Sequence, residues 1–138
     1  KFSISPEKFW SVPADIFIPA SVTDVINASN KGRVRTKIIV EAGNIPMRES
    51  IEHEFFRKGI LIVPDFVANA GGVISSYAEY RGYNPKRMFE MVKAKIVKST
   101  RRVLERSLKE KKNPRAVAMA IAKKLVEEKA KKRGTTFR

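Results

Sequence analysis

Apolar and polar positions along the first half of the chain predict three strands separated by short helices. Apolar runs that lack helical spacing occupy residues 14–18 apart from Asp15, 37–40 after Lys37, and 59–63, and each is followed by turn-forming residues. Short apolar runs of this kind are typical of parallel strands that are covered on both faces. Short helical connections between such strands make right-handed crossovers. We therefore predict an α/β fold with a three-stranded parallel sheet flanked by helices.

The segments between the predicted strands carry helical signals. Ser5-Pro6 starts a short helix through about Trp10, because serine caps and proline suits the first helical position. A second short helix is predicted after Pro19-Ala20-Ser21, with its apolar residues Val22, Val25 and Ile26 facing inward. A third contains Ile51 and Phe55, four residues apart on one face, and ends at Gly59. The exposed edge of the first strand has to be covered by another segment.

The second half of the chain predicts helices only. One helix begins at Gly71-Gly72 and runs to about Arg81, a second begins at Asn84-Pro85 and runs to about Glu110, and a third begins at Asn113-Pro114, with Gly134 as its stop. We expect the two long helices to pack as an antiparallel pair against the sheet or a neighbouring domain. Residues 1–82 are thus predicted to form an α/β unit, and residues 83–138 a helical pair packed on it.

The candidate chemistry lies where the third strand ends. Residues 64–77 follow this strand with Asn69 and the pair Gly71-Gly72, where backbone N–H groups lie open at a helix start. In an open α/β sheet the ligand crevice lies outside the carboxyl ends of the strands. The segment is a candidate binding loop, although asparagine and paired glycines also form ordinary turns.

Three motifs resemble one known family. Ala68-Asn69-Ala70-Gly71-Gly72-Val73, together with residues 15–20 and 37–46, is similar to sequences of the glutamate/leucine/phenylalanine/valine dehydrogenases, most of all their glutamate dehydrogenases. The resemblance runs from about Ile4 to about Lys132. It implies the later part of a Rossmann-like dinucleotide-binding domain followed by two long C-terminal helices, and hence a chain that is part of a longer protein.

The resemblance also implies particular contacts. Backbone groups of Pro19 and Ala20 are expected to lie against the cofactor near its nicotinamide ribose, where Ser21 replaces the family's usual alanine. Asn44 and Asn69 are expected to orient the nicotinamide carboxamide, because an asparagine side chain offers both a donor and an acceptor. Ser76 matches the serine that contacts the distal carboxylate of glutamate. Ala42-Gly43 inverts the family's common Gly-Ala order before Asn44, so the resemblance does not determine the conformation of the backbone there.

The parent protein is therefore predicted to be an amino-acid dehydrogenase that deaminates L-glutamate oxidatively to 2-oxoglutarate with NAD or NADP. The chain contains no Gly-x-Gly-x-x-Gly turn, and the family's acid/base lysine and aspartate have no counterpart in it. We assign it no catalytic residue and expect it to be inactive alone. Its expected partners are the N-terminal portion of the parent, further copies in a homo-oligomer, and the small-molecule substrate.

The distribution of charge is compatible with a function other than that of a dehydrogenase. The net charge is +15, of which residues 70–138 contribute +14 and residues 1–69 contribute +1. A basic helical surface can bind nucleic acid or another anionic partner, so the chain could instead be a degenerate half-domain that acts as a binding module. Its lysines and arginines alternate with apolar residues rather than with stacking aromatics, which argues against nucleic acid.

The composition does not indicate a metal site, a disulfide or a membrane segment. The single histidine, His53, suits a surface or packing position better than a metal site, and none is predicted. The absence of cysteine fits a reducing cytoplasm, and the sequence gives no sign of a membrane segment.

Overall fold

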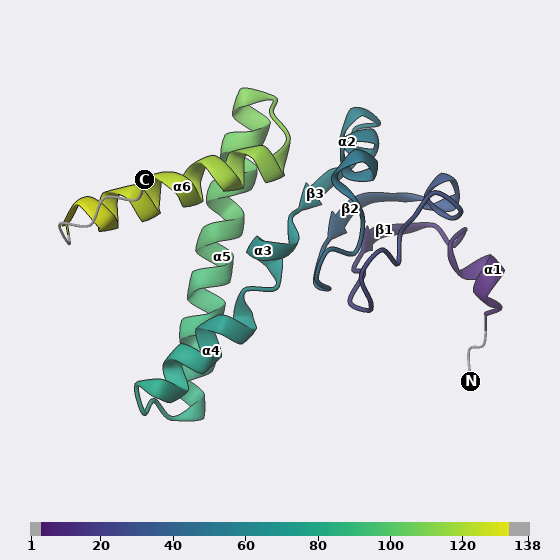
Figure 1. Cartoon of the computed structure of the whole chain (residues 1–138). Helices are drawn as coiled ribbons and strands as arrows, with labels where there is room; N and C mark the ends of the chain where they lie inside the picture. The colour runs from purple at the N-terminus through teal and green to yellow at the C-terminus, as the bar shows by residue number, and fades with distance from the viewer. Residues whose placement is uncertain (1–3, 133–138) are drawn as a thin grey trace.

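The structure is a computed structural model that describes residues 4–132. Its strands are β1 (Ala14–Phe17), β2 (Thr36–Val40) and β3 (Leu61–Val63). Its helices are α1 (Pro6–Phe9), the 3-10 turn η1 (Lys31–Arg33), α2 (Glu49–Arg57), α3 (Asp65–Ala68), α4 (Gly71–Tyr80), α5 (Pro85–Glu110) and α6 (Pro114–Lys132). Figure 1 shows the sheet with α1 and α2 on one side of the molecule, and α4, α5 and α6 on the other.

The three strands form one parallel sheet in the order β1-β2-β3. Ile16 pairs with Ile38, and Ile38 in turn pairs with Leu61. This confirms the predicted parallel sheet flanked by helices. Because the strands are parallel, the loops that follow them leave from one edge of the sheet.

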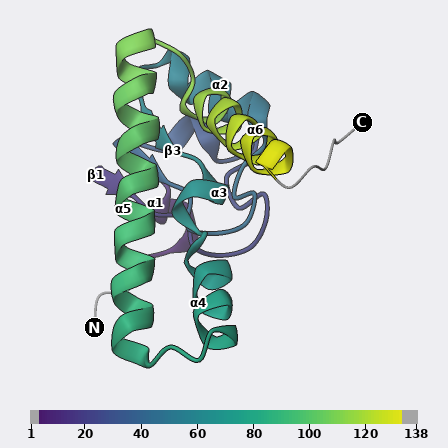
Figure 2. The same ribbon diagram turned by 90° about the vertical axis from the view of Figure 1, so that its left-hand side faces the viewer.

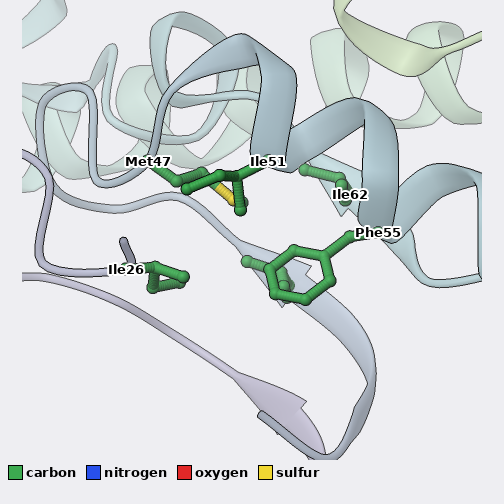
Figure 3. Packing of buried hydrophobic residues seen from close by; sticks show 6 residues of the cluster. Ile26, Met47, Ile51, Phe55 and Ile62 are labelled. Atoms are coloured by element: carbon green, nitrogen blue, oxygen red, sulfur yellow. The ribbon is translucent and has the colours of Figure 1, made fainter. Parts of the chain in front are cut away.

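Successive residues of β3 face opposite sides of the sheet, and each side has its own hydrophobic core. On the first side Ile62 packs with five other buried residues, of which α2 contributes two (Figure 3). The members of this first core are Ile26, Ile39, Met47, Ile51, Phe55 and Ile62. On the opposite side Val63 packs against the long helices. The members of this second core are Val63, Val67, Val103, Val117, Ala118 and Ile121.

The prediction that residues 14–18 are a buried strand is wrong in its burial, although the strand itself is confirmed. In β1 only Phe17 is partly buried, while Ile16 keeps 53% of its surface exposed and Ile18 keeps 55%. Phe17 contacts Trp10 edge-on, with ring centroids 6.1 Å apart. Ile16 and Ile18 lie on the opposite face of the sheet from Phe17, and the second core, which covers that face at Val63, includes no residue of β1.

The helix predicted after Pro19-Ala20-Ser21 is absent, and residues 21–30 form turns instead. Two backbone hydrogen bonds hold this segment to the loop after β2, from Asp24 N to Ile45 O and from Ile26 N to Pro46 O, both 2.9 Å. Asp24 has a left-handed φ of 56° that no helix accommodates. Ile26 is buried as expected, but Val22 is 71% exposed. Hydrogen bonds to a loop distant in the sequence thus hold this segment in turns, although the spacing of its apolar residues favours a helix.

The long helices begin where the sequence predicts. The Asn84 side chain caps α5 by accepting a hydrogen bond from Arg87 N at 2.9 Å, and the Asn113 side chain accepts one from Arg115 N at 2.8 Å in α6. They do not form the expected antiparallel pair, because α6 crosses α5 at a steep angle in both views (Figures 1 and 2). Lys111 ends α5 in a left-handed conformation that redirects the chain. The predicted stop at Gly134 lies outside the described residues.

No helix among residues 4–132 combines the length and apolar character that a membrane span needs.

Candidate cofactor site at the carboxyl ends of the strands

The loops that follow the three strands meet at Gly43. Gly43 N donates to Pro19 O at 2.8 Å, and Asn69 Nδ2 donates to Gly43 O at 3.2 Å. A Cβ atom at Gly43 would lie 2.9 Å from Ser21 O and 3.3 Å from Pro19 O. Only glycine therefore allows these loops to approach so closely. The inverted Ala42-Gly43 order places glycine where this approach requires it.

Pro19, Ala20, Asn44 and Asn69 all belong to these joined loops. Pro19 is buried, and its carbonyl accepts the Gly43 hydrogen bond, whereas Ala20 is exposed. Asn44 is exposed, and its carbonyl accepts a hydrogen bond from Thr23 Oγ1 at 3.0 Å. The half-buried Asn69 lies at the end of α3. The structure thus brings the four predicted cofactor residues to one edge of the sheet, and their roles stay predictions.

Ser76 stands apart from this group. It lies on an exposed part of α4, and its hydroxyl donates to Gly72 O in the same helix at 3.1 Å. Ser75 makes the same kind of bond, at 2.8 Å. Among residues 4–132, no hydrogen bond joins Ser76 to the three loops. Its hydroxyl would have to rotate away from Gly72 to contact a substrate.

A buried charge cluster joins α6 to the segments that follow β2 and β3, and it is not among the features predicted from the sequence. Arg115, in the first turn of α6, donates from Nε to Glu52 Oε2 at 2.5 Å. Its Nη2 donates to Glu41 Oε2 at 2.8 Å and to Asp65 Oδ1 at 3.1 Å. The three carboxylates come from the end of β2, from α2 and from the start of α3. We call these four residues the Arg115 cluster.

One signal in the sequence could have pointed to this cluster. The positive end of the helix dipole favours acidic side chains in a first turn, yet α6 has none there and carries Arg115 instead. The first turn of α5 shows the same pattern with Lys86 and Arg87, so the signal marks a candidate and does not identify the cluster by itself. Glu41 and Asp65, which directly follow β2 and Pro64, are the acidic residues that such a helix start could meet.

Burial determines the protonation behaviour of the Arg115 cluster. Burial, reinforced by the nearby charge of Glu52, raises the pKa of Glu41 to about 7. Burial also raises the pKa of Glu52, although the hydrogen bond from Arg115 opposes that change. Burial acts to lower the pKa of Arg115, but hydrogen bonding to Glu52 and the charges of Glu41 and Asp65 outweigh it and raise that pKa, so the guanidinium stays charged.

Other surface features lie away from the loops. A hollow of about 590 Å³ is bordered by residues of α5 alone, including Lys93, Val97 and Arg101, and is the side of one helix. His53 is exposed on α2. Within residues 4–132, no group of three histidine or carboxylate side chains is arranged to hold a metal ion.

Comparisons with known proteins agree with this architecture. The model of the glutamate/leucine/phenylalanine/valine dehydrogenase family matches residues 1–134. A glutamate dehydrogenase from Aeropyrum pernix is 34% identical over 141 residues, which span 95% of this chain and 34% of that protein. An NADP-specific glutamate dehydrogenase from Saccharolobus shibatae is 40% identical over 77 residues, or 56% of this chain and 18% of that protein. The chain thus spans about a third of the Aeropyrum relative.

Solved structures show the same fold. L-tryptophan dehydrogenase from Nostoc punctiforme superimposes with a TM-score of 0.80 at 27% identity, over 89% of this chain and 37% of that one. A leucine-bound hetero-hexameric glutamate dehydrogenase from Thermus thermophilus also gives 0.80, at 21% identity, over 99% of this chain and 34% of that one. At that identity the likeness concerns the fold alone. The predicted partial Rossmann-like fold is confirmed, and the chain belongs to the glutamate/leucine/phenylalanine/valine dehydrogenase family.

Proposed function

We propose that the chain forms the nicotinamide side of the cofactor pocket in an NAD- or NADP-dependent amino-acid dehydrogenase. The hydrogen bonds of Gly43 carry this proposal. They join the loop that contains Gly43 and Asn44 to Pro19 and to Asn69, at the edge where open α/β sheets bind ligands. Asn44 and Asn69 can together offer donors and acceptors to a carboxamide. The family relationship supplies the reaction class.

L-Glutamate is the proposed substrate, converted oxidatively to 2-oxoglutarate. The names of the Aeropyrum and Saccharolobus relatives support this choice, as does the match of Ser76 to the serine expected to contact the distal carboxylate. The Nostoc relative, named for tryptophan, shows that the fold also occurs with another substrate. We expect the remaining parts of the site to come from an N-terminal portion of the parent, which forms a homo-oligomer. A cytoplasmic location stays a prediction.

The direct test measures reduction of NAD⁺ and of NADP⁺ by full-length protein with L-glutamate, L-leucine, L-phenylalanine or L-tryptophan. We expect L-glutamate to give the highest kcat/KM. Preference for another amino acid would keep the reaction class and overturn the substrate. If none of the four supported reduction of either nucleotide, the proposed function would be wrong.

The proposed pocket has its own test in Asn69→Ala. If Asn69 orients the carboxamide, kcat/KM should fall at least about tenfold, the equivalent of 1.4 kcal/mol. Asn84→Ala is the matched control, since it removes a helix cap distant in the chain from the loops and should lower stability without a specific loss of turnover. Turnover and affinity within about twofold of wild type in Asn69→Ala would contradict the assignment.

A further inference from the structure

Arg115 connects the C-terminal helix to the loops of the proposed pocket. Its side chain is 18% exposed and meets three carboxylates, of which Glu41 is fully buried, Glu52 is 1% exposed and Asp65 is 7% exposed. These residues lie 74, 63 and 50 positions before Arg115 in the chain. A planar guanidinium with donors in a fixed fork can reach several carboxylates at once, whereas a lysine ammonium acts as a point charge.

Two of these carboxylates also bind loop backbone. Glu41 Oε2 accepts from Asp65 N at 2.8 Å, so it links the end of β2 to the start of α3. Asp65 Oδ2 accepts from Ile45 N at 3.1 Å, and Ile45 directly follows Asn44 with a left-handed φ of 46°. A non-glycine residue adopts such a φ only where its surroundings enforce it. The bond from Asp65 is one such constraint.

The same connection reaches Asn69. Asn69 N donates to Asp65 O at 2.7 Å, and its side chain donates to Gly43 O. Arg115 thus donates to the Asp65 carboxylate, which accepts from Ile45 N beside Asn44, and the backbone of α3 joins Asp65 to Asn69. Three carboxylates around one guanidinium would repel one another without it.

We propose that Arg115 is a positioning residue that holds the loop 41–46 and the segment 64–69, which contains α3, together, so that Asn44 and Asn69 face the nicotinamide carboxamide. The carboxamide part of this inference rests on the proposed function, whereas the holding of the loops does not. The helix α6 thereby belongs to the cofactor site without contacting the cofactor.

Hydrogen exchange in the full-length protein tests the loop-holding part directly. In Arg115→Lys, which keeps the charge but loses the fork, the amides of Ile45 and Asp65 should exchange at least tenfold faster, while those of Ile39 and Ile62 keep their wild-type rates. Arg106→Lys is the matched control, because Arg106 pairs with Glu110 on the exposed surface of α5. Unchanged loop amides, or equal acceleration of sheet and loop amides, would overturn the inference.

Cofactor binding tests the carboxamide part. Arg115→Lys should weaken binding of the oxidised dinucleotide at least tenfold but change binding of ADP-ribose, which lacks nicotinamide, by less than twofold. Equal losses for the two ligands, or no loss for either, would contradict a positioning role. If wild-type protein bound no dinucleotide, the proposed function and the carboxamide part would both fail, and hydrogen exchange would still decide whether Arg115 holds the loops.

Asp65→Asn provides a second variant in case Arg115→Lys does not fold. It removes one charge from a cluster with more carboxylates than cations, so the excess negative charge becomes smaller. An asparagine offers one acceptor and one donor group, so either Arg115 Nη2 or Ile45 N must face an NH₂ group. The amide of residue 65, whose acceptor Glu41 Oε2 is unchanged by the substitution, should exchange at least tenfold faster while β2 and β3 stay protected, and a wild-type rate there would overturn the inference.

Discussion

Gly43 is the residue at which the three loops approach most closely. Gly43→Ala would place a methyl group against the backbone oxygens of Ser21 and Pro19, which cannot rotate away as a side chain could. We expect the free energy of unfolding to fall by about 1–3 kcal/mol, the usual cost of overpacking. Gly32→Ala is the control, since a Cβ there meets nothing within 4 Å, and it should change stability by less than about 0.5 kcal/mol. Urea titration of both variants checks this, and equal stabilities would contradict the close approach.

Ser76 and Ser75 form a matched pair for the proposed substrate contact. Both hydroxyls donate to Gly72 O, so replacing either with alanine removes the same bond within α4. If Ser76 binds the distal carboxylate, Ser76→Ala should raise the KM for L-glutamate roughly tenfold, a loss of about 1.4 kcal/mol, whereas Ser75→Ala should not. Steady-state kinetics of the full-length protein decides between them. Equal KM values in the two variants would remove Ser76 from the site.

At the scale of elements, the ion pair between Glu41, which follows β2, and Arg115 of α6 should make stability depend on pH. Glu41 has a pKa of about 7 in the folded chain against an ordinary 4.5, so the folded state holds its proton more tightly. The Glu41 contribution to stability is therefore largest below pH 4.5 and decreases as the pH rises to 7. Between pH 4.5 and 7.5, wild type should lose on the order of 2 kcal/mol relative to Glu41→Gln, which cannot ionise.

Urea unfolding of wild type and Glu41→Gln at the two pH values measures this difference. Glu110→Gln serves as the control, because hydrogen bonds from Arg106 and Lys112 lower the pKa of Glu110, so its ionisation does not weaken the fold as the pH rises. The free energy of unfolding of Glu110→Gln should change with pH as that of wild type does. Parallel pH profiles for wild type and Glu41→Gln would show that Glu41 ionises normally.

The helices α5 and α6 carry most of the excess positive charge, and we expect this charge to be a solvated surface. Residues 85–132 contain 17 lysines and arginines against five glutamates. Such a surface binds nucleic acid at low salt whatever its function, but counterion release weakens that binding steeply as salt rises. In an anisotropy titration with a DNA duplex, binding should be lost by about 0.15 M salt. Tight binding that persists at that salt would favour the binding-module alternative.

Some elements could be predicted from local signals and others could not. The caps at Asn84 and Asn113 and the apolar runs of the three strands depend on neighbours in the sequence, so the helices and strands they predict are present. The turn structure of residues 21–30 depends on hydrogen bonds to Ile45 and Pro46, and the crossing of α6 over α5 depends on Lys111 and the packing of Val117. These determinants are contacts between residues far apart in the sequence, or a backbone conformation such as that of Lys111. The periodicity of apolar residues does not reveal either.

At the scale of the whole molecule, the sheet separates two cores that the apolar pattern does not distinguish. Ile62 and Val63 are adjacent apolar residues, yet they belong to different cores. The sequence predicts that both are buried, and only the arrangement of the helices shows what covers each. In the candidate site, the loops could be found from their motifs. Arg115 could not, because it meets partners 50 to 74 positions away and belongs to no motif.

The separation in sequence between Arg115 and its partners imposes an order of assembly. The first core uses residues 26–62, so a chain emerging from the ribosome can close it before α6 has been synthesised. During synthesis the loops stay without their cation until residue 115 is available. In a complete chain, the same long separation should delay their closure, so we expect the ligand edge to form last. In pulsed hydrogen exchange during refolding of the 138-residue chain, the amides of Ile39 and Ile62 should become protected before those of Ile45 and Asp65. Simultaneous protection would mean that the loops close without waiting for the C-terminal helix.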